Sequence, residues 1–375
     1  MKSVAIVGCG FVADLYMRSL QTFPDIRVSA VFDRSQQRLA AFCTHWGVEP
    51  ASSLDALLSG LPANGLLLNL TNPSAHYEIN CAALEAGHHV FCEKPLALSL
   101  KEAQKLCALA KQESLQLGSA PSSVLGEAAQ TLGYALRQGV GGTPRLIYAE
   151  LDDGYIPQAP IQDWASESGA PWPYQDEFRV GCTLEHAGYY LSWLIAMFGP
   201  VSKVLASSSE LVPDKRGVTG GAPDFSVAVL HFENGPVVRL TCSISAPHDH
   251  RFRVICDEGV IALTKAWDNA APVKYHRRLK IRRRLLEHPL GRRIRLKQKD
   301  THPKLPRTGA AAMNFALGPA EMLDAIAAGV PSRIAGDFAL HLTEVTLAIQ
   351  NSGDSGGAYQ PVSRCEPMEP MPWAH

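Results

Sequence analysis

The chain has 375 residues, of which 46% are hydrophobic and 19% are charged, and its formal net charge is −1. A chain of this length is longer than one hydrophobic core usually accommodates, so we expect two domains. The near-neutral charge excludes an overall attraction to nucleic acid or to a membrane, and binding to either would require a local patch.

The nine cysteines indicate a reducing compartment. They form no CxxC pair and no cysteine–histidine cluster with zinc spacing, so we predict no metal site. Several lie in apolar segments, where a free cysteine behaves as a small hydrophobe. The apolar run at the N-terminus is too short for a signal peptide, and no segment approaches the ~20 apolar residues of a membrane span. We therefore expect a cytoplasmic protein.

The N-terminal residues have the pattern of a strand, a glycine turn and a helix. Residues 3–7 (SVAIV) are typical of a buried strand, and GCGFVA follows directly. Gly8 allows a sharp turn, and Gly10 lets backbone N–H groups approach a pyrophosphate at the helix N-terminus. Ala13 is small enough for the helix to pack closely on the strand. This pattern predicts a dinucleotide-binding turn.

An acidic residue after the next strand supports the same interpretation. The apolar run 27–32 ends at Asp33, whose carboxylate can accept hydrogen bonds from both hydroxyls of an adenosine ribose. NAD is favoured because this carboxylate would repel a 2′-phosphate. Arg34 leaves NADP as the alternative, since its guanidinium could contact that phosphate.

Apolar strands and helices then alternate as far as residue 119. The expected elements are strands at 66–70, 89–92 and 115–119 and helices at 74–87 and 99–113. This alternation predicts an α/β fold with a parallel sheet and helices on both faces. Ligands of such sheets lie at the carboxyl ends of the strands, where the loops 71–76 (TNPSAH) and 93–95 (EKP) fall.

The motifs of this region resemble those of the Gfo/Idh/MocA oxidoreductases, a family named for glucose-fructose oxidoreductase and inositol dehydrogenase. They are Gly8-Cys9-Gly10-Phe11-Val12-Ala13, Asp33-Arg34, Thr71-Asn72-Pro73 with His76, and Ala86-Gly87-His88-His89-Val90 running into Glu93-Lys94-Pro95-Leu96. The last string is the most diagnostic. The resemblance implies a Rossmann NAD(P)-binding domain at 1–120 and an α+β domain at 121–375 that binds substrate and forms oligomers.

The resemblance also implies the cofactor site. In the family the EKP lysine stands beside the nicotinamide, close to the substrate hydroxyl, and the TNP loop packs under the cofactor; the lysine here is Lys94. The residues expected to bind NAD(P) are Gly8, Gly10, Phe11, Val12, Asp33, Arg34, Thr71, Asn72, Pro73, His76, Glu93, Lys94 and Pro95.

The proton transfer that alcohol oxidation requires also makes Lys94 a candidate catalytic residue. Oxidation of a secondary alcohol removes a hydride from carbon and a proton from oxygen, so a proton acceptor must reach that oxygen. A free lysine has a pKa near ~10.4 and is a poor base at neutral pH, so we expect burial or a neighbouring cation to lower the pKa of Lys94. Pro95 helps to end the strand and to fix the turn that aims this lysine.

The rest of the chain predicts an α+β domain. Its expected elements are a helix at 126–138, a long strand within 141–154, successive strands between 202 and 264, and closing helices at 320–329 and 337–352. The strands follow one another with short turns, which indicates an open, mainly antiparallel sheet. One face of such a sheet would cover the cofactor cleft, and the other could contact a second subunit.

A predicted helix at 181–199 carries further candidate catalytic residues. It aligns with the family segment that usually has an aspartate and, four positions later, a histidine beside the substrate; Glu185 and Tyr189 occupy these positions, with His186 adjacent. Tyr189 could exchange a proton if Lys94 lowers its pKa, or His186 could act from a shifted position. Alternatively, Glu185 only binds sugar hydroxyls, or the helix is simply buried with a satisfied histidine–glutamate pair.

The proline-rich loop before this helix carries side chains that suit a carbohydrate. Trp164 and Trp172 could pack on a sugar face, and Asp176 could bind hydroxyls, although loop aromatics more often pin the loop itself. We treat these three residues, together with Tyr174 and Glu177 of the same loop, as second-rank substrate candidates.

Residues 275–307 form a basic insert, with thirteen lysines and arginines against two acids. A solvated basic loop is the first interpretation. The alternatives are contact with an anionic membrane surface, with the phosphates of a nucleotide-linked sugar, or with an acidic neighbouring subunit. We expect no nucleic acid, because no recognition motif accompanies the charge.

Together these patterns predict an NAD(P)-dependent dehydrogenase that acts on a CH–OH group of a sugar, cyclitol or nucleotide sugar and assembles as a homo-oligomer. One alternative regenerates bound NAD in each turnover, as a redox-assisted epimerase, lyase or glycosidase would. The other is a non-catalytic NAD(P)-binding sensor, which would have no need of Lys94.

Overall fold

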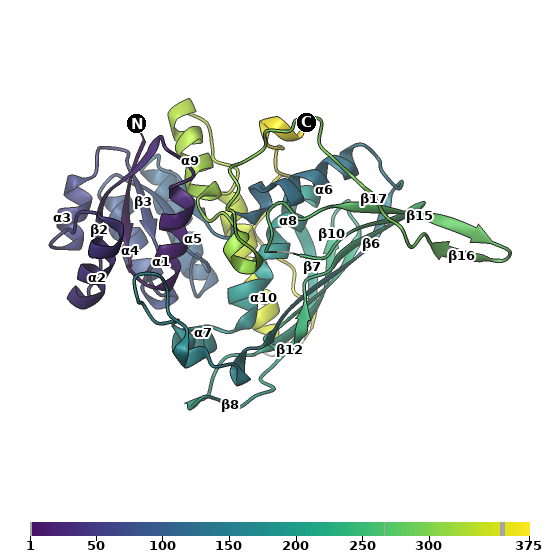
Figure 1. Ribbon diagram of the computed structural model, residues 1–375, viewed down its shortest axis with the longest axis horizontal. Coiled ribbons are helices and arrows are strands. Elements are labelled where there is room, and N and C mark those ends of the chain that lie inside the picture. The colour runs from purple at the N-terminus through teal and green to yellow at the C-terminus, as the bar shows by residue number, and fades with distance from the viewer. Residues whose placement is uncertain (1, 266, 353–356) are drawn as a thin grey trace.

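The computed structural model describes residues 2–265, 267–352 and 357–375, and two sheets organise them (Figure 1). The N-terminal sheet is parallel, with the strand order β2-β1-β3-β4-β5. Its strands are β1 (Lys2–Val7), β2 (Ile26–Phe32), β3 (Leu66–Asn69), β4 (His89–Cys92) and β5 (Leu117–Ser119). The helices of this half are α1 (Phe11–Leu20), α2 (Gln36–Trp46), α3 (Leu54–Gly60), α4 (Pro73–Glu85) and α5 (Leu100–Gln112).

Helices cover both faces of this sheet because its strands are apolar on both sides. In β1, Val4 and Ile6 join an apolar cluster with residues of α1 and α2, whereas Ala5 and Val7 join a second cluster with residues of α3, α4 and α5. Successive side chains of a strand point to opposite faces, so a continuous apolar run buries both. The predicted Rossmann architecture is confirmed.

The strand order places a reversal between β1 and β3. The chain moves from β1 outward to β2, then returns to the other side of β1 for β3, β4 and β5. In open parallel sheets, ligands bind beyond the carboxyl ends of the strands at such a reversal. The glycine turn after β1 and the loops after β3 and β4 therefore meet at one edge.

The C-terminal half contains a larger mixed sheet, which Figure 1 shows extending to the right of the N-terminal half. Its main path is β16-β15-β14-β13-β6-β11-β10-β7, and β12 and β17 pair with β6 and β15. The pairs are antiparallel except for β6 with β11, so the predicted mainly antiparallel sheet is confirmed. The strands are β6 (Pro144–Tyr155), β7 (Val201–Ser209), β10 (Phe225–Phe232), β11 (Val237–Ser243), β12 (Ser245–Asp249), β13 (Phe252–Cys256), β14 (Gly259–Leu263), β15 (Lys274–Ile281), β16 (Arg284–Glu287) and β17 (Arg292–Arg293), with a separate small pair β8 (Asp214–Lys215) and β9 (Val218–Thr219).

Helices of the C-terminal half lie between the two sheets. They are α6 (Glu127–Arg137), α7 (Tyr174–Val180), α8 (Gly188–Phe198), α9 (Leu317–Ala328) and α10 (Asp337–Gln350), with short 3-10 turns at Ser123–Leu125, Ile156–Gln158, Ile161–Asp163, Gly309–Ala312 and Pro372–Ala374. Helix α9 packs on the N-terminal sheet so closely that a Cβ at Gly318 would lie 2.5 Å from the Phe91 ring. No helix in the described part of the chain is both long enough and apolar enough to cross a membrane.

The predicted single helix at 181–199 is wrong in one respect. Helix α7 ends before Gly181, whose φ of +99° interrupts the helical path. A π-helical turn, Thr183–Ala187, follows and leads directly into α8. Because a π-helix bonds residue i to residue i+5, Glu185 does not stand one regular α-helical turn before Tyr189.

The basic insert forms strands. Its first part is β15, and β15 and β16 form a hairpin that projects from the far end of the sheet (Figure 1). The exposed side chains on this hairpin and the turn after it include Ile281, Leu285, Leu286 and Leu290. Residues 274–293 of the basic segment therefore contain paired strands, whereas residues 294–307 lie outside any helix or strand, and the binding partners of the segment remain predictions.

The turn at Gly8 generates a prediction about folding. Gly8 has a φ of +97°, and a Cβ there would lie 2.6 Å from the Leu70 carbonyl oxygen. We expect Gly8→Ala to lower the free energy of unfolding by at least about 2 kcal/mol, because strained backbone costs about 1–3 kcal/mol before the clash is counted. Chemical denaturation measures this change.

The matched control is Gly10→Ala, two residues away. Gly10 has a φ of −86°, and no atom lies within 4 Å of a Cβ built there. We expect this variant to change the free energy of unfolding by less than about 1 kcal/mol, the scale of a helix-cap effect. Equal destabilisation by both substitutions would contradict the steric explanation.

Candidate active site

A cavity of about 340 Å³ lies between the carboxyl edge of the N-terminal sheet and the α7–α8 region. Most of the sequence-predicted site residues line it, although they come from segments far apart in the chain. They are Gly10, Phe11, Val12, Thr71, Asn72, Pro73, Glu93, Lys94, Trp164, Trp172, Asp176, Glu185, His186 and Tyr189. The predicted residues outside this lining are Gly8, Asp33, Arg34, His76 and Pro95.

Two helices of the N-terminal half, α1 and α4, have uncapped N-termini at the cavity. Elsewhere in the N-terminal half, Ser35, Ser53 and Ser99 cap α2, α3 and α5 by accepting a backbone N–H. In the described chain, α1 and α4 follow Gly10 and Asn72, which provide no side-chain cap. Both helices present the positive end of a dipole to an anion, and α1 also presents free N–H groups, whereas Pro73 at the start of α4 has no N–H. The open space at Gly10 and these free N–H groups fit the pyrophosphate of a dinucleotide.

Asp33 is held at the end of β2, next to the glycine turn. Its carboxylate accepts hydrogen bonds from the Cys9 N–H at 2.9 Å and the Ser35 N–H at 2.7 Å. The Arg38 guanidinium lies 3.7 Å away, and Arg34 is exposed beside it. These bonds fix the carboxylate where an adenosine ribose would extend from the turn.

Hydrogen bonds from buried side chains hold the EKP turn in place. Glu93 accepts a hydrogen bond from the Tyr16 hydroxyl at 2.6 Å. The fully buried His76 ring lies between two loops, with Nδ1 2.7 Å from the Pro95 carbonyl oxygen and Nε2 2.9 Å from that of Thr71. His76 therefore joins the TNP loop to the EKP turn from a position behind the cavity wall.

Lys94 forms an ion pair with Glu185 inside the cavity. Burial lowers the pKa of Lys94, but the carboxylates of Glu185 and Glu177 outweigh it and raise that pKa well above its ordinary value. The expectation that its surroundings lower the pKa of Lys94 is therefore wrong. The sequence could not reveal this, because Glu185 reaches the lysine only through the tertiary fold. Lys94 is an ammonium group at neutral pH.

The pKa values of two further groups in the cavity are raised. Burial and the neighbouring Glu185 raise the pKa of Glu177 well above its ordinary value, which favours its neutral form. Burial also raises the pKa of Tyr189 and outweighs the opposing effect of Lys94. The predicted lowering of the Tyr189 pKa by Lys94 is wrong for this reason, since desolvation disfavours the phenolate.

The proline-rich loop closes one side of the cavity with paired aromatic rings. The ring centroids of Trp164 and Trp172 lie 5.1 Å apart. Asp176, at the start of α7, accepts a hydrogen bond from the Asn72 side chain and so links this loop to the N-terminal half. Ser168 anchors the loop on α1, because its backbone N–H and hydroxyl both donate to Asp14, at 3.1 and 2.8 Å.

Asp153 and Trp267 line the cavity but were not among the candidate site residues of the sequence. Asp153 lies in β6, and Trp267 follows β14. The Trp267 ring stacks on Tyr189 with centroids 5.0 Å apart, and Asp153 lies 3.7 Å from His186. Neither residue has a local signal in the sequence, whereas the second-rank candidate Glu177 also lines the cavity.

Two family models match the chain. Residues 2–120 match the model described as "Oxidoreductase family, NAD-binding Rossmann fold", and residues 129–262 match the "GFO/IDH/MocA C-terminal domain". Together they cover more than half of the chain. They agree with the two sheets of the fold and with the dinucleotide fit at the glycine turn.

Curated relatives and solved structures belong to the same group. The chain is similar to the uncharacterized oxidoreductase YfiI of Bacillus subtilis, with 30% identity over 54% of this chain and 51% of that protein. It is also similar to myo-inositol 2-dehydrogenase of Thermotoga maritima, with 25% identity over 69% of this chain and 74% of that protein. The WlbA dehydrogenase of Bordetella pertussis, in complex with NADH and UDP-GlcNAcA, superposes with a TM-score of 0.71 at 17% identity, covering 96% and 97% of the two chains. The chain belongs to the Gfo/Idh/MocA family of oxidoreductases, and its N-terminal domain is the NAD-binding Rossmann domain of that family.

Proposed function

We propose that this protein transfers a hydride between a nicotinamide cofactor and the hydroxyl-bearing carbon of a sugar, cyclitol or nucleotide sugar, with Lys94 managing the proton. The observation that carries the proposal is the Lys94–Glu185 ion pair, which stands in the same cavity as the free helix N-terminus at Gly10. The proposed units are 1–120 for the cofactor and 121–375 for the substrate, with the basic hairpin as an accessory.

The residues present would hold the cofactor through the α1 N-terminus, the Asp33 carboxylate and the TNP loop. When bound, the nicotinamide supplies the hydride acceptor or donor. The protein must then supply a proton at the substrate oxygen during reduction, or remove one during oxidation. Each of these steps has a candidate group in the cavity.

For reduction, Lys94 is already in the required state. Its ammonium group can donate a proton to the oxygen as a carbonyl becomes an alcohol, leaving a neutral amine. For oxidation, the substrate hydroxyl passes its proton to Lys94 as Lys94 passes one of its ammonium protons to the Glu185 carboxylate. Because the two groups are in contact, this relay needs no movement of the main chain.

The shape and polarity of the cavity support a polyhydroxylated substrate. The Trp164–Trp172 pair offers an apolar surface for the C–H face of a sugar ring, while Asp176 and Glu177 can form hydrogen bonds with hydroxyl groups. The names of the relatives, inositol dehydrogenase and a dehydrogenase bound to a UDP-sugar, support the same substrate class.

The remaining expectations concern the cellular location, the oligomeric state and the binding partners of the protein. Cytoplasmic location, a homo-oligomer formed through the C-terminal sheet, and an anionic partner for the basic hairpin all stay predictions. The redox-assisted alternative uses the same Lys94–Glu185 pair and differs only in producing no net NADH.

Removing the Lys94 amine tests its proposed role in proton transfer to and from the substrate oxygen. We expect Lys94→Met to lower turnover by about 10²–10⁴-fold, the range of a general acid–base group, while NADH binding stays measurable by fluorescence. Lys101→Met, on the exposed side of α5, is the control. Full activity in Lys94→Met with a sugar that the wild type reduces or oxidises would contradict the proposal.

The pH dependence of reduction tests the ion pair. Lys94 donates only as ammonium, so the rate falls as the pH rises through its pKa, which Glu185 holds high. Glu185→Gln removes that carboxylate and leaves the burial, which lowers the pKa. We therefore expect the alkaline limb of kcat/KM for carbonyl reduction to move to lower pH, and Glu113→Gln on the surface to leave it in place. An unmoved limb in Glu185→Gln would exclude Lys94 as the titrating donor.

Cofactor preference tests the role of Asp33. We expect Asp33→Ala to weaken NAD binding at least about 10-fold, because it removes charge-assisted hydrogen bonds to the ribose. The same change frees Arg38 to contact a 2′-phosphate, so NADP binding should improve, and the double variant with Arg38→Ala should lose that gain. Calorimetric titration with both cofactors measures the ratio, and an unchanged ratio in Asp33→Ala would be evidence against ribose recognition by this residue.

A further inference from the structure

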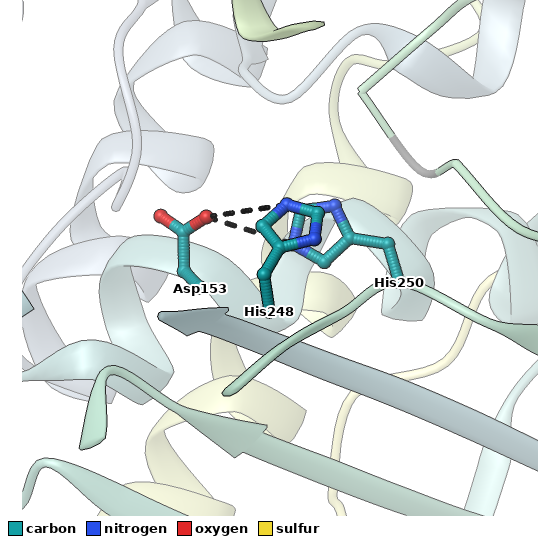
Figure 2. A group of neighbouring side chains, drawn as sticks. All are labelled: Asp153, His248 and His250. Carbon is teal, nitrogen blue, oxygen red and sulfur yellow. Dashed lines mark ion pairs between the residues drawn. The ribbon is translucent and has the colours of Figure 1, made fainter. Parts of the chain in front are cut away.

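Three potential metal ligands converge beside the cavity, at the end of the large sheet. They are Asp153, His248 and His250, which we call the Asp153 cluster, and one ligand atom of each lies within 4.8 Å of the others. Asp153 Oδ1 is 3.6 Å from His250 Nε2 and 4.0 Å from His248 Nε2. Figure 2 shows both imidazoles facing the same carboxylate.

An irregularity in strand pairing assembles this cluster. Strand β12 pairs with β6 through Ala246 and Gly154, but the register then shifts so that Asp249 pairs with Asp152. His248 and His250 are two positions apart, and residues with that spacing in extended chain lie on one side. Their ring centroids lie 3.9 Å apart, with the ring planes tilted by 42°. In the sequence the two residues form an H-x-H pattern.

The surroundings of Asp153 leave its charge without a permanent cation. Its ion-pair partners among the described residues are three histidines: His186, His248 and His250. His250 is buried, and its Nε2 accepts a hydrogen bond from the Trp267 indole N–H at 2.9 Å. The same nitrogen lies 3.6 Å from Asp153 Oδ1, so it faces the carboxylate as well as the indole.

We propose that Asp153, His248 and His250 bind a divalent transition-metal ion of the zinc class. Two imidazoles and one carboxylate are a common ligand set for such ions, and three protein ligands leave positions open. Bonds of about 2.0–2.1 Å at tetrahedral angles require ligand atoms about 3.3 Å apart, so closure from the observed 3.6 and 4.0 Å needs small side-chain shifts. A metal at His250 Nε2 takes the place of the indole N–H, so Trp267 must move slightly.

The position of the cluster gives the ion a role at the cavity. Asp153, His186 and Trp267 all line the cavity wall, so an ion held by Asp153 stands at its edge. Its open positions can bind adjacent oxygen atoms of a substrate, such as a vicinal diol or a hydroxy-carboxylate, and so select substrates that carry that pair. This role rests on the proposed function, whereas the binding site itself does not.

The first experiment measures metal binding without substrate. The full-length protein is stripped with a chelator and then titrated with Zn²⁺ by calorimetry and with Co²⁺ by visible absorption. We expect His248→Ala to weaken the tight site at least 10-fold and to remove the Co²⁺ ligand-field bands. The His248 side chain is 62% exposed, so we expect its removal to leave the fold intact. His45→Ala, which removes another exposed imidazole, should bind as the wild type does.

The outcomes separate the site from the proposed function. Equal Zn²⁺ and Co²⁺ binding by wild type and His248→Ala, or no Co²⁺ bands in the wild type, overturns the metal site, whether or not Lys94→Met is inactive. Loss of binding in both His248→Ala and Asp153→Asn, with His45→Ala unaffected, supports the site even if no sugar is turned over. Trp267 emission gives a second readout, because Co²⁺ beside this ring should quench it in wild type and not in His248→Ala.

Discussion

The contact between Lys94 and Glu185 is the interaction on which the proposed chemistry depends. One partner follows the fourth strand of the nucleotide-binding sheet, and the other lies in the π-helical turn of the second half. Each charge would be costly to bury alone, so the pair holds only while both halves stay closed around it. The Lys94 side chain is 19% exposed and the Glu185 side chain 4%, and such burial strengthens their mutual attraction. The arrangement of the two domains and the protonation state of Lys94 are thus coupled.

The sequence predicted the parts of the site that are encoded locally. Gly8, Gly10 and Asp33 follow from strand-turn-helix spacing, and Lys94 from a motif at a strand end; the structure places Gly10 and Lys94 on one cavity and Asp33 at its margin. Such features depend on neighbouring residues in the chain, so a linear pattern contains them. The two sheets were predictable for the same reason.

The sequence did not predict the features of the site that depend on contacts between residues far apart in the chain. The pKa of Lys94 is raised because Glu185 and Glu177 lie against it, and neither contact can be read from spacing. The π-helical turn depends on how α7 and α8 meet after Gly181. Asp153 meets His248 and His250 only because strand pairing shifts by an irregular step. These features arise from tertiary contacts, which hydrophobic periodicity does not predict.

The packing of α9 and of residues 334–336 on the nucleotide-binding sheet has a consequence for biosynthesis. The Leu117 carbonyl accepts a hydrogen bond from Gly336, Ser119 donates to Ile334, and Gly318 packs closely on Phe91. The first sheet can therefore reach its native burial only after residues 317–336 have been synthesised. A truncated N-terminal fragment would keep the apolar face near Phe91 in water, where a chaperone or another copy could bind it.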